Sequence, residues 1–176
     1  DLPIRQVVAP ADGAEVPATG LVDPNVRMLT FPVDVTGGNL VIPNRFGGYS
    51  GVHGAGGHNG LDIGRGSDCG DFTASGQPLV ACAAGQMVDT SFDSRTYGLK
   101  ITLRDAYGNH FHYHHMDSVV NGLELGDPVE PGQVVGFVGT TGNTRWAHLH
   151  FEVWVGGLSR RRGGRPVDPE PWLPLP

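Results

Sequence analysis

The sequence predicts an all-β domain built on an antiparallel sheet or sandwich, with long glycine-rich loops. From residue 78 onward, short apolar or alternating runs follow one another, separated by Gly, Asp, Asn or Pro turns. The chain of 176 residues contains 28 glycines and 14 prolines, a composition that favours many turns and few helices. No segment shows the 3.6-residue apolar period of an amphipathic helix.

The N-terminal part of the chain is expected to contribute little regular structure. Residues 1–28 are rich in Pro, Ala and Asp and predict an extended arm packed on a domain that occupies residues 29–176. A short strand is expected at residues 29–33. Residues 47–66 contain nine glycines in twenty positions and predict a loop, the kind of segment that carries function when a scaffold holds it.

The strands that follow are expected in a regular succession. The stretch "DAYGNH" at residues 105–110 separates two of them and indicates a hairpin. The proline-rich tail, residues 165–176, should lie extended on the surface, anchored by Trp172. The predicted strands lie at residues 78–92, 98–105, 109–116, 133–139 and 147–155.

Composition excludes two classes of partner. The formal net charge of -6 argues against nucleic acid, because phosphate contacts need clustered Lys and Arg. The basic cluster Arg160–Arg165 is short and is interpreted as a solvated loop. No apolar run approaches the roughly 20 residues of a membrane span, so no transmembrane segment is expected. No feature of the sequence indicates an oligomeric state.

The two cysteines, Cys69 and Cys82, are expected to form a disulfide. Closing a loop of this size would stabilise a loop-rich domain by about 3 kcal/mol on the chain-entropy argument. A bridge would also place the protein in an oxidising compartment. The alternative is a pair of reduced, buried thiols.

Histidines recur in the last predicted strand, "AHLHFEVWV". Side chains alternate across a strand, so Ala147 and every second residue after it form one wholly apolar face that should be core. His148, His150, Glu152 and Trp154 share the other face. The two histidine Cα atoms would lie about 6.6 Å apart, which lets both imidazoles reach one small object in front of the sheet.

The run "HFHYHHM" carries four more histidines in an alternating pattern. Phe111, Tyr113 and His115 fall on one face, and we expect a partly enclosed site there, with His115 beside it. The even-numbered histidines fall on the other face and are expected to be solvent-facing or edge residues. They are His110, His112 and His114.

His58 and Asp62, in "HNGLD", form a third candidate cluster. In a straight strand their Cα atoms would be about 13 Å apart, too far to share an ion comfortably. Gly60 and the flanking glycines disfavour a helix and allow a bent chain that curves around a metal.

Two imidazoles and one carboxylate suit a catalytic zinc ion, which keeps its fourth position for water. His58 and Asp62 would supply two ligands and one of His148 and His150 the third. The other histidine, together with His115, would then handle protons, since the chain has no HExxH helix with a glutamate base.

Three motifs resemble, in order and spacing, the signatures of the lysostaphin/LytM-type zinc metallopeptidases. They are "HNGLDIG", "YHHM" and "HLHFEVW". "GQPLVACAAGQMV", "GDPVEPGQVVGFVGTTGNT" and "VDPEPWL" resemble further family segments, so that the similarity extends from about Phe31 to Leu173. The cysteine pair is a departure from the family pattern, and Met116 stands where Leu is commoner.

The resemblance implies the family's catalytic-domain fold, an antiparallel sheet or sandwich whose glycine-rich loops surround a groove. It implies that His58, Asp62 and His150 bind one Zn²⁺ and that His115 and His148 are the catalytic pair. The implied activity is that of an endopeptidase that cuts cross-links or stem peptides of bacterial peptidoglycan, outside the cytoplasmic membrane.

Two other functions remain open at this point. A catalytically silent relative of the same fold could activate another wall hydrolase, although the intact ligand set argues against this. A cupin-like metal oxygenase would use both His148 and His150 as ligands and would leave His58 and Asp62 idle.

Residues beside these motifs have two interpretations each. Glu152 could hydrogen-bond a site histidine or serve the sheet, and the second is slightly favoured. Tyr113 could border a groove or pack in the core. Trp146 and Trp154 could line a groove, but packing on the sheet is favoured.

Overall fold

The computed structural model describes residues 29–36, 38–48, 57–66 and 73–174. The predicted arm of residues 1–28 lies outside this part of the chain, so the division into arm and domain stays a prediction. Helical structure in the described part is limited to two short 3-10 turns, η2 (Arg160–Arg162) and η3 (Glu170–Trp172). Neither could cross a membrane.

Strands make up most of the regular structure in the described residues and join into one sheet with antiparallel pairing throughout. The predicted fold class is therefore confirmed. The main path of the sheet runs β1-β2-β9-β6-β5-β4-β7, while β10 pairs with β9 and β8 pairs with both β3 and β6. The strands are β1 (Leu40–Asn44), β2 (Leu61–Arg65), β3 (Pro78–Val80), β4 (Gly85–Asp93), β5 (Gly98–Arg104), β6 (His110–Val119), β7 (Pro128–Val129), β8 (Val134–Val138), β9 (Leu149–Val155) and β10 (Arg165–Val167).

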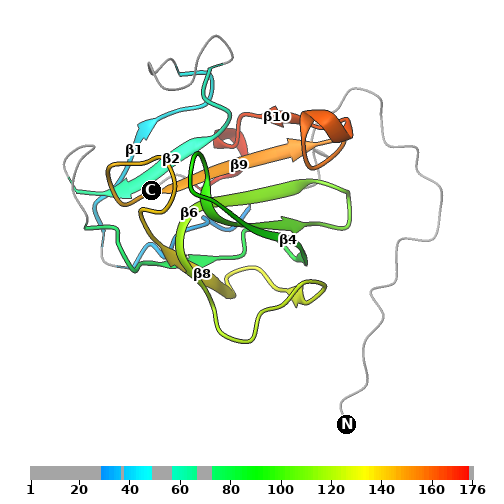
Figure 1. The fold of residues 1–176 in the computed structure, drawn as a ribbon, viewed down its shortest axis with the longest axis horizontal. Coiled ribbons are helices and arrows are strands. Elements are labelled where there is room, and N and C mark those ends of the chain that lie inside the picture. Colours follow the sequence, from blue (N-terminus) through cyan, green and yellow to red (C-terminus); the bar gives the residue numbers. More distant parts are fainter. Residues whose placement is uncertain (1–28, 37, 49–56, 67–72, 175–176) are drawn as a thin grey trace.

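Strand β9 lies in the middle of the sheet, between β2 and β6 (Figure 1). Its register is the feature that matters most for function. His150 lies opposite Asp62 of β2 on one side and opposite His114 of β6 on the other. Directly opposed residues of antiparallel strands have adjacent side chains, so this register collects a carboxylate and two imidazoles on one face.

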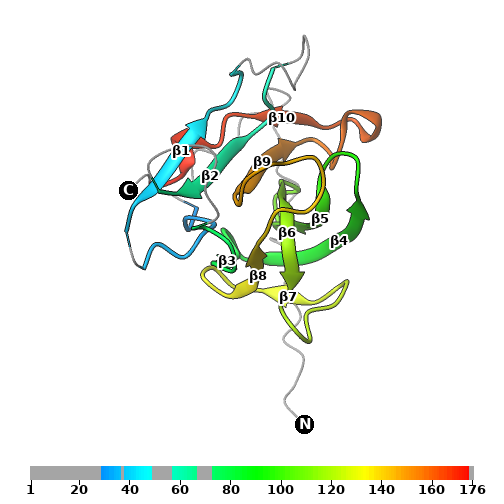
Figure 2. The ribbon, with the colours of Figure 1, turned by 60° about the vertical axis from the view of Figure 1, so that its left-hand side comes forward.

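The other face of β9 is core, as the alternation predicts. Leu149, Phe151 and Val153 are each at most 1% exposed. Strand β8, low in the view of Figure 2, pairs with the C-terminal part of β6 on one side and with β3 on the other. Tyr113 belongs to this core: its hydroxyl donates to the Val80 carbonyl oxygen and accepts the backbone N–H of Cys82.

The predicted alternation of β6 fails at His115. The register between β5 and β6 shifts by one residue there, so that His114 and His115 both lie opposite Lys100. His115 has a φ of 60°, a left-handed conformation that is uncommon for residues other than glycine. At the same point β6 changes its partner from β9, paired up to His114, to β8, paired from Met116 onward. A bulge of this kind re-aims a side chain, and here it turns His115 away from the aromatic face.

The loop prediction for residues 47–66 is wrong at its end, because Leu61–Arg65 forms strand β2. Leu61 and Ile63 alternate with Asp62 and Gly64 and are buried in the core, so the period-two pattern outweighs the local density of glycine. Gly60 is needed just before the strand. A Cβ atom there would lie 2.1 Å from the Phe151 carbonyl oxygen, so only glycine lets the chain approach β9 this closely.

Other boundaries also differ from expectation. The strand expected at residues 29–33 is reduced to a single bridge between Val33 and Leu79. The expected strand at 78–92 divides into β3 and β4. The hairpin of β5 and β6 is confirmed, and the Asp105 carboxylate accepts the backbone N–H groups of Tyr107 and Asn109 in its turn.

The tail and the cysteines can be compared with prediction only in part. Residues 165–167 are extended, as expected, but η3 supplies one short helical turn at Glu170–Trp172. Cys82 is a buried free thiol, and Cys69 lies outside the described residues. The structure therefore does not show the predicted disulfide.

The contribution of the Tyr113 hydroxyl to the stability of the core can be tested. Replacing Tyr113 by Phe leaves a buried carbonyl and a buried N–H unpaired, so we expect the free energy of unfolding to fall by about 1–3 kcal/mol in urea titrations. Tyr107→Phe, at a side chain that is 57% exposed, is the matched control and should change it by less than about 0.5 kcal/mol. Equal stability of the two variants would show that the hydroxyl contributes nothing.

Candidate metal centre

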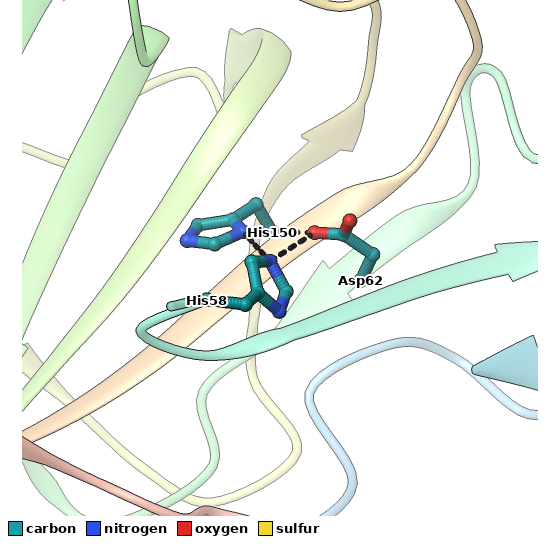
Figure 3. Close-up of side chains that lie close together, drawn as sticks. All are labelled: His58, Asp62 and His150. Atoms are coloured by element: carbon teal, nitrogen blue, oxygen red, sulfur yellow. Dashed lines mark hydrogen bonds and ion pairs between the residues drawn. The ribbon is translucent and has the colours of Figure 1, made fainter. Parts of the chain in front are cut away.

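The candidate site lies on the polar face of β9, where three predicted ligands meet. His58 stands on the chain that leads into β2, Asp62 within β2, and His150 in β9 (Figure 3). The His58 Nε2 atom is 2.9 Å from His150 Nδ1 and 3.1 Å from Asp62 Oδ1. The third edge, from His150 Nδ1 to Asp62 Oδ1, is 2.8 Å.

The outer atoms of the three side chains are held by hydrogen bonds that orient the inner ones. The Nδ1 of His58 lies 3.1 Å from the Arg45 carbonyl oxygen, and the Nε2 of His150 lies 2.9 Å from Glu152 Oε1. Each of these partners accepts, so each outer nitrogen carries the proton. Neutral imidazoles held in this way present lone pairs at their inner nitrogens. Asn44 donates to Asp62 Oδ2 over 2.7 Å and leaves Oδ1 facing inward.

Three lone pairs that converge within about 3 Å repel one another unless a cation lies between them. The observed separations are close to the edge of a tetrahedron around zinc, about 3.3 Å for bonds of 2.0–2.1 Å. Two imidazoles, one carboxylate and an open fourth direction are the donor set of a catalytic zinc site. The residues present therefore fit a zinc ion.

A proton can occupy the same place in the metal-free chain. Burial lowers the pKa of His150, but hydrogen bonds to Asp62 and Glu152 outweigh it and raise that pKa to about 9. Burial acts against the Asp62 carboxylate as well, yet its three histidine contacts hold its pKa well below the ordinary value. A metal that binds Nδ1 of His150 must displace this proton, so binding releases a proton.

His148 and His115 lie beside the three candidate ligands. The Nε2 of His148 is 3.5 Å from Asp62 Oδ1, and its Nδ1 is 3.1 Å from the Trp146 carbonyl oxygen. The Nδ1 of His115 lies 2.8 Å from the carbonyl oxygen of Thr141. Both Nδ1 atoms therefore donate to backbone carbonyl oxygens, which orients the two rings. The two rings are 4.9 Å apart between centroids.

Burial is the main influence on the proton affinity of His115. Together with the neighbouring His148, it lowers the pKa of His115 to about 3. The neutral imidazole is therefore the form present at pH 7, and a neutral imidazole can accept a proton.

The prediction that the even-numbered histidines of β6 face solvent or an edge is wrong. His110, His112 and His114 are 8%, 4% and 3% exposed. They lie opposite Trp154, Glu152 and His150 of β9 and so extend the polar face of the site along the sheet. The alternation places these residues on the polar face, but it cannot show that this face is buried.

Glu152 connects the two groups of histidines. Its Oε1 accepts from His150 and its Oε2 accepts from Trp154 Nε1 over 2.5 Å. The less favoured interpretation of Glu152, contact with a site histidine, is therefore the correct one. His114, His150 and Glu152 also lie close enough to hold a metal. That group is the poorer candidate, because both carboxylate oxygens are already used and His150 has one lone pair.

Two residues on the loop that leads into β9 support the site. The Thr141 hydroxyl holds the bulge, because it donates to the Met116 carbonyl oxygen and accepts the N–H of Leu99. Trp146, expected to serve the sheet, stacks on the ring of His148 with 4.1 Å between centroids. Both lie within seven residues of His148 in the sequence, but the local pattern does not show which groups they contact.

A cavity of about 250 Å³ opens in front of the site. His115, His150 and Glu152 line one part of it, and Tyr97 and Asn143 line another. A space of this size admits a short stretch of peptide rather than a whole protein domain.

The fold and the site together define a β-sheet protein with a preformed three-residue centre for a metal and two further imidazoles beside it. A comparison with protein families matches residues 56–169 to Peptidase family M23. The match covers more than half of the chain, and the chain belongs to this family.

Individual relatives agree with this assignment. Lysostaphin of Staphylococcus simulans is 31% identical over 102 residues, 58% of this chain and 20% of the relative. The glycyl-glycine endopeptidase ALE-1 of Staphylococcus capitis is 30% identical over 123 residues, 70% and 30% of the two chains. The L-Ala–D-Glu endopeptidase of Bacillus subtilis is 33% identical over 85 residues, 48% and 23% of the two chains.

The likeness extends to three dimensions. The crystallised catalytic domain of lysostaphin, described as an antimicrobial peptidase, superposes with a TM-score of 0.60 at 29% identity. The superposition covers 77% of this chain and 90% of that domain. The chain thus matches that one domain of lysostaphin, and the aligned part spans only 20–30% of the length of lysostaphin and ALE-1.

Glu152 provides a test of how the candidate ligands are oriented. Both His150 Nε2 and Trp154 Nε1 need an acceptor, and a Gln side chain has only one acceptor oxygen. We therefore expect Glu152→Gln to weaken zinc binding by about 10–100-fold in chelator competition. Glu130→Gln, at an exposed site, should leave the affinity unchanged. Equal affinity in both variants would contradict the positioning role.

His112 provides a test of how the burial of an imidazole affects stability at low pH. Burial, and to a lesser extent His114, lowers the pKa of His112 to about 3, whereas the unfolded chain takes up this proton near pH 6.5. The unfolded state thus binds more protons between these values, and stability falls as the pH drops from 6.5 toward 3. We expect His112→Gln to reduce the slope of unfolding free energy against pH by up to about 1.4 kcal/mol per pH unit. An unchanged slope would contradict a neutral His112.

Proposed function

We propose that this chain is the catalytic part of a zinc-dependent endopeptidase that hydrolyses peptide cross-links or stem peptides of bacterial peptidoglycan. The observation that carries the proposal is the convergence of three inward lone pairs, from His58, Asp62 and His150, with two more imidazoles alongside. Peptidase family M23 is generally zinc-dependent, and relatives are named for cutting glycyl-glycine or L-Ala–D-Glu bonds.

In this proposal His58 Nε2, Asp62 Oδ1 and His150 Nδ1 hold one Zn²⁺. When bound, the ion supplies Lewis acidity, which lowers the pKa of a water molecule and polarises the scissile carbonyl. Glu152, Asn44 and the Arg45 carbonyl oxygen keep the three ligands oriented.

His115 and His148 handle the protons. Each is fixed through Nδ1 by a backbone carbonyl, which leaves its Nε2 for the reaction. The Nε2 of one imidazole accepts a proton from the attacking water and passes the same proton to the leaving amine, while the other imidazole holds the water in place. The 4.9 Å between ring centroids allows both to face one tetrahedral carbon.

The substrate class places the protein outside the cytoplasmic membrane, where peptidoglycan lies. Two rivals are a silent activator of another hydrolase and a cupin-like oxygenase. The silent activator needs none of the five residues intact. The cupin interpretation uses His148 together with His150 and leaves His58 and Asp62 idle, although His58 Nε2 and Asp62 Oδ1 lie 2.9 Å and 2.8 Å from His150 Nδ1.

Two substitutions separate these functions. Asp62→Ala removes a ligand and should strip zinc as measured by elemental analysis, whereas Asp117→Asn, at an exposed carboxylate, should keep it. His148→Ala should retain stoichiometric zinc and lose about 10²–10⁴-fold in kcat on purified wall material, with fragments followed by mass spectrometry. Zinc retained by Asp62→Ala would support the cupin, and a zinc-loaded wild-type protein that releases no peptide would support the activator.

A further inference from the structure

A second cavity of about 300 Å³ adjoins the first on the same face of the sheet. Asn59, Tyr97 and Glu152 line both cavities, so they are two parts of one depression. A peptide that crosses the candidate metal centre would therefore extend into the second cavity. None of the five residues assigned to metal binding or proton transfer lines it.

The wall of this cavity contains an imidazole whose ring nitrogens make no hydrogen bond. His112 and His114 are more than nine-tenths buried, and both line the cavity. His112 Nδ1 lies 2.9 Å from Thr102 Oγ1, whereas both ring nitrogens of His114 lack a hydrogen bond and its Nε2 is 3.9 Å from Glu152 Oε2. A neutral imidazole has one N–H, so His114 buries a donor without an acceptor in either tautomer, which prepares it for a ligand that accepts.

The rim of the cavity is basic. Arg160, Arg161 and Lys100 line it, and the guanidinium of Arg160 lies 5.5 Å from the centre of the Trp154 ring. Arg160 also donates to Asn59 Oδ1 over 3.2 Å, which holds it at the edge of the depression. Lys100 pairs with Asp89 at 2.9 Å. The interpretation of Arg160–Arg165 as a merely solvated loop is thus incomplete.

The wall of the second cavity offers few free hydrogen-bond acceptors. Glu152 is the one carboxylate among the described residues that line this cavity, and its two oxygens already accept from His150 and Trp154. What remains for an incoming ligand is the unfilled N–H donor of His114 and the guanidinium groups of Arg160 and Arg161. A carboxylate has only acceptors and binds such a set best.

We propose that this second cavity is a subsite for a free carboxylate of the substrate, carried by a residue that flanks the scissile bond. The proposal rests on the proposed endopeptidase function and narrows it. The preferred substrate is an acidic peptide, whereas an uncharged glycine bridge would leave the buried N–H of His114 and the arginines unused.

Matched peptides test the subsite. From the fragments of wall digestion, a short cleavable peptide is made in two forms that differ only by a carboxylate or its carboxamide beside the cut bond. Wild-type protein should cleave the carboxylate form with a kcat/KM about tenfold higher. In the double variant Arg160→Gln, Arg161→Gln this preference should fall to about twofold or less, while Arg162→Gln, on the same turn but outside the cavity, should keep it.

A binding experiment tests this subsite independently of the proposed catalytic function. Zinc-loaded His148→Ala protein is titrated calorimetrically with both peptide forms, or with synthetic Ala-Glu and Ala-Gln stem peptides if wild-type protein cleaves nothing. Tighter binding of the carboxylate form, lost in the double arginine variant, supports the subsite even where the absence of cleavage defeats the proposed function. Equal binding of both forms, or a preference that survives the double variant, overturns the subsite.

Discussion

The register of β9 between β2 and β6 is the constraint on which the rest of the site depends. It sets His150 opposite Asp62 on one side and opposite His114 on the other. A slip of one residue would turn every side chain of β9 to the opposite face, burying imidazoles in the core and exposing Leu149 and Phe151. The apolar face therefore specifies the position of the polar one. Gly60 permits the close approach that brings His58 to the same point.

The second constraint is the bulge at His115. Strand β6 pairs with β9 up to His114 and with β8 from Met116, so the residue between them is released from the regular pleat. Its left-handed backbone costs free energy, which the hydrogen bonds of Thr141 to Met116 and to the His115 ring help to offset. Within the described strands His115 is the one residue other than glycine with a positive φ, and it is a residue to which we assign proton transfer.

The polar face of the sheet buries two imidazoles, His112 and His114, and the ring nitrogens of His114 make no hydrogen bond. The folded protein loses stability as the pH falls, because burial favours the neutral forms of His112 and His114. A core built for stability alone would place apolar residues there. The lower stability that these buried imidazoles cause is explained if a ligand occupies the cavity during function. The same residues then reduce the stability of the ligand-free domain and provide the substrate specificity that we propose.

The sequence by itself determined the fold class, the core face of β9 and the five side chains proposed for metal and proton chemistry, because periods of two and motif spacings are local properties of the chain. Only the tertiary structure decided which face His115 uses, that His112 and His114 are buried, and that Glu152 orients His150. The first two depend on elements distant in sequence, namely β8 at the bulge and the residues of η2 that line one cavity with His112 and His114. Glu152 and His150 lie on the same strand, but only the folded geometry shows their hydrogen bond. Within a regular strand the local pattern specifies the face of a side chain, whereas bulges, burial and contacts are set by the packing of the whole fold.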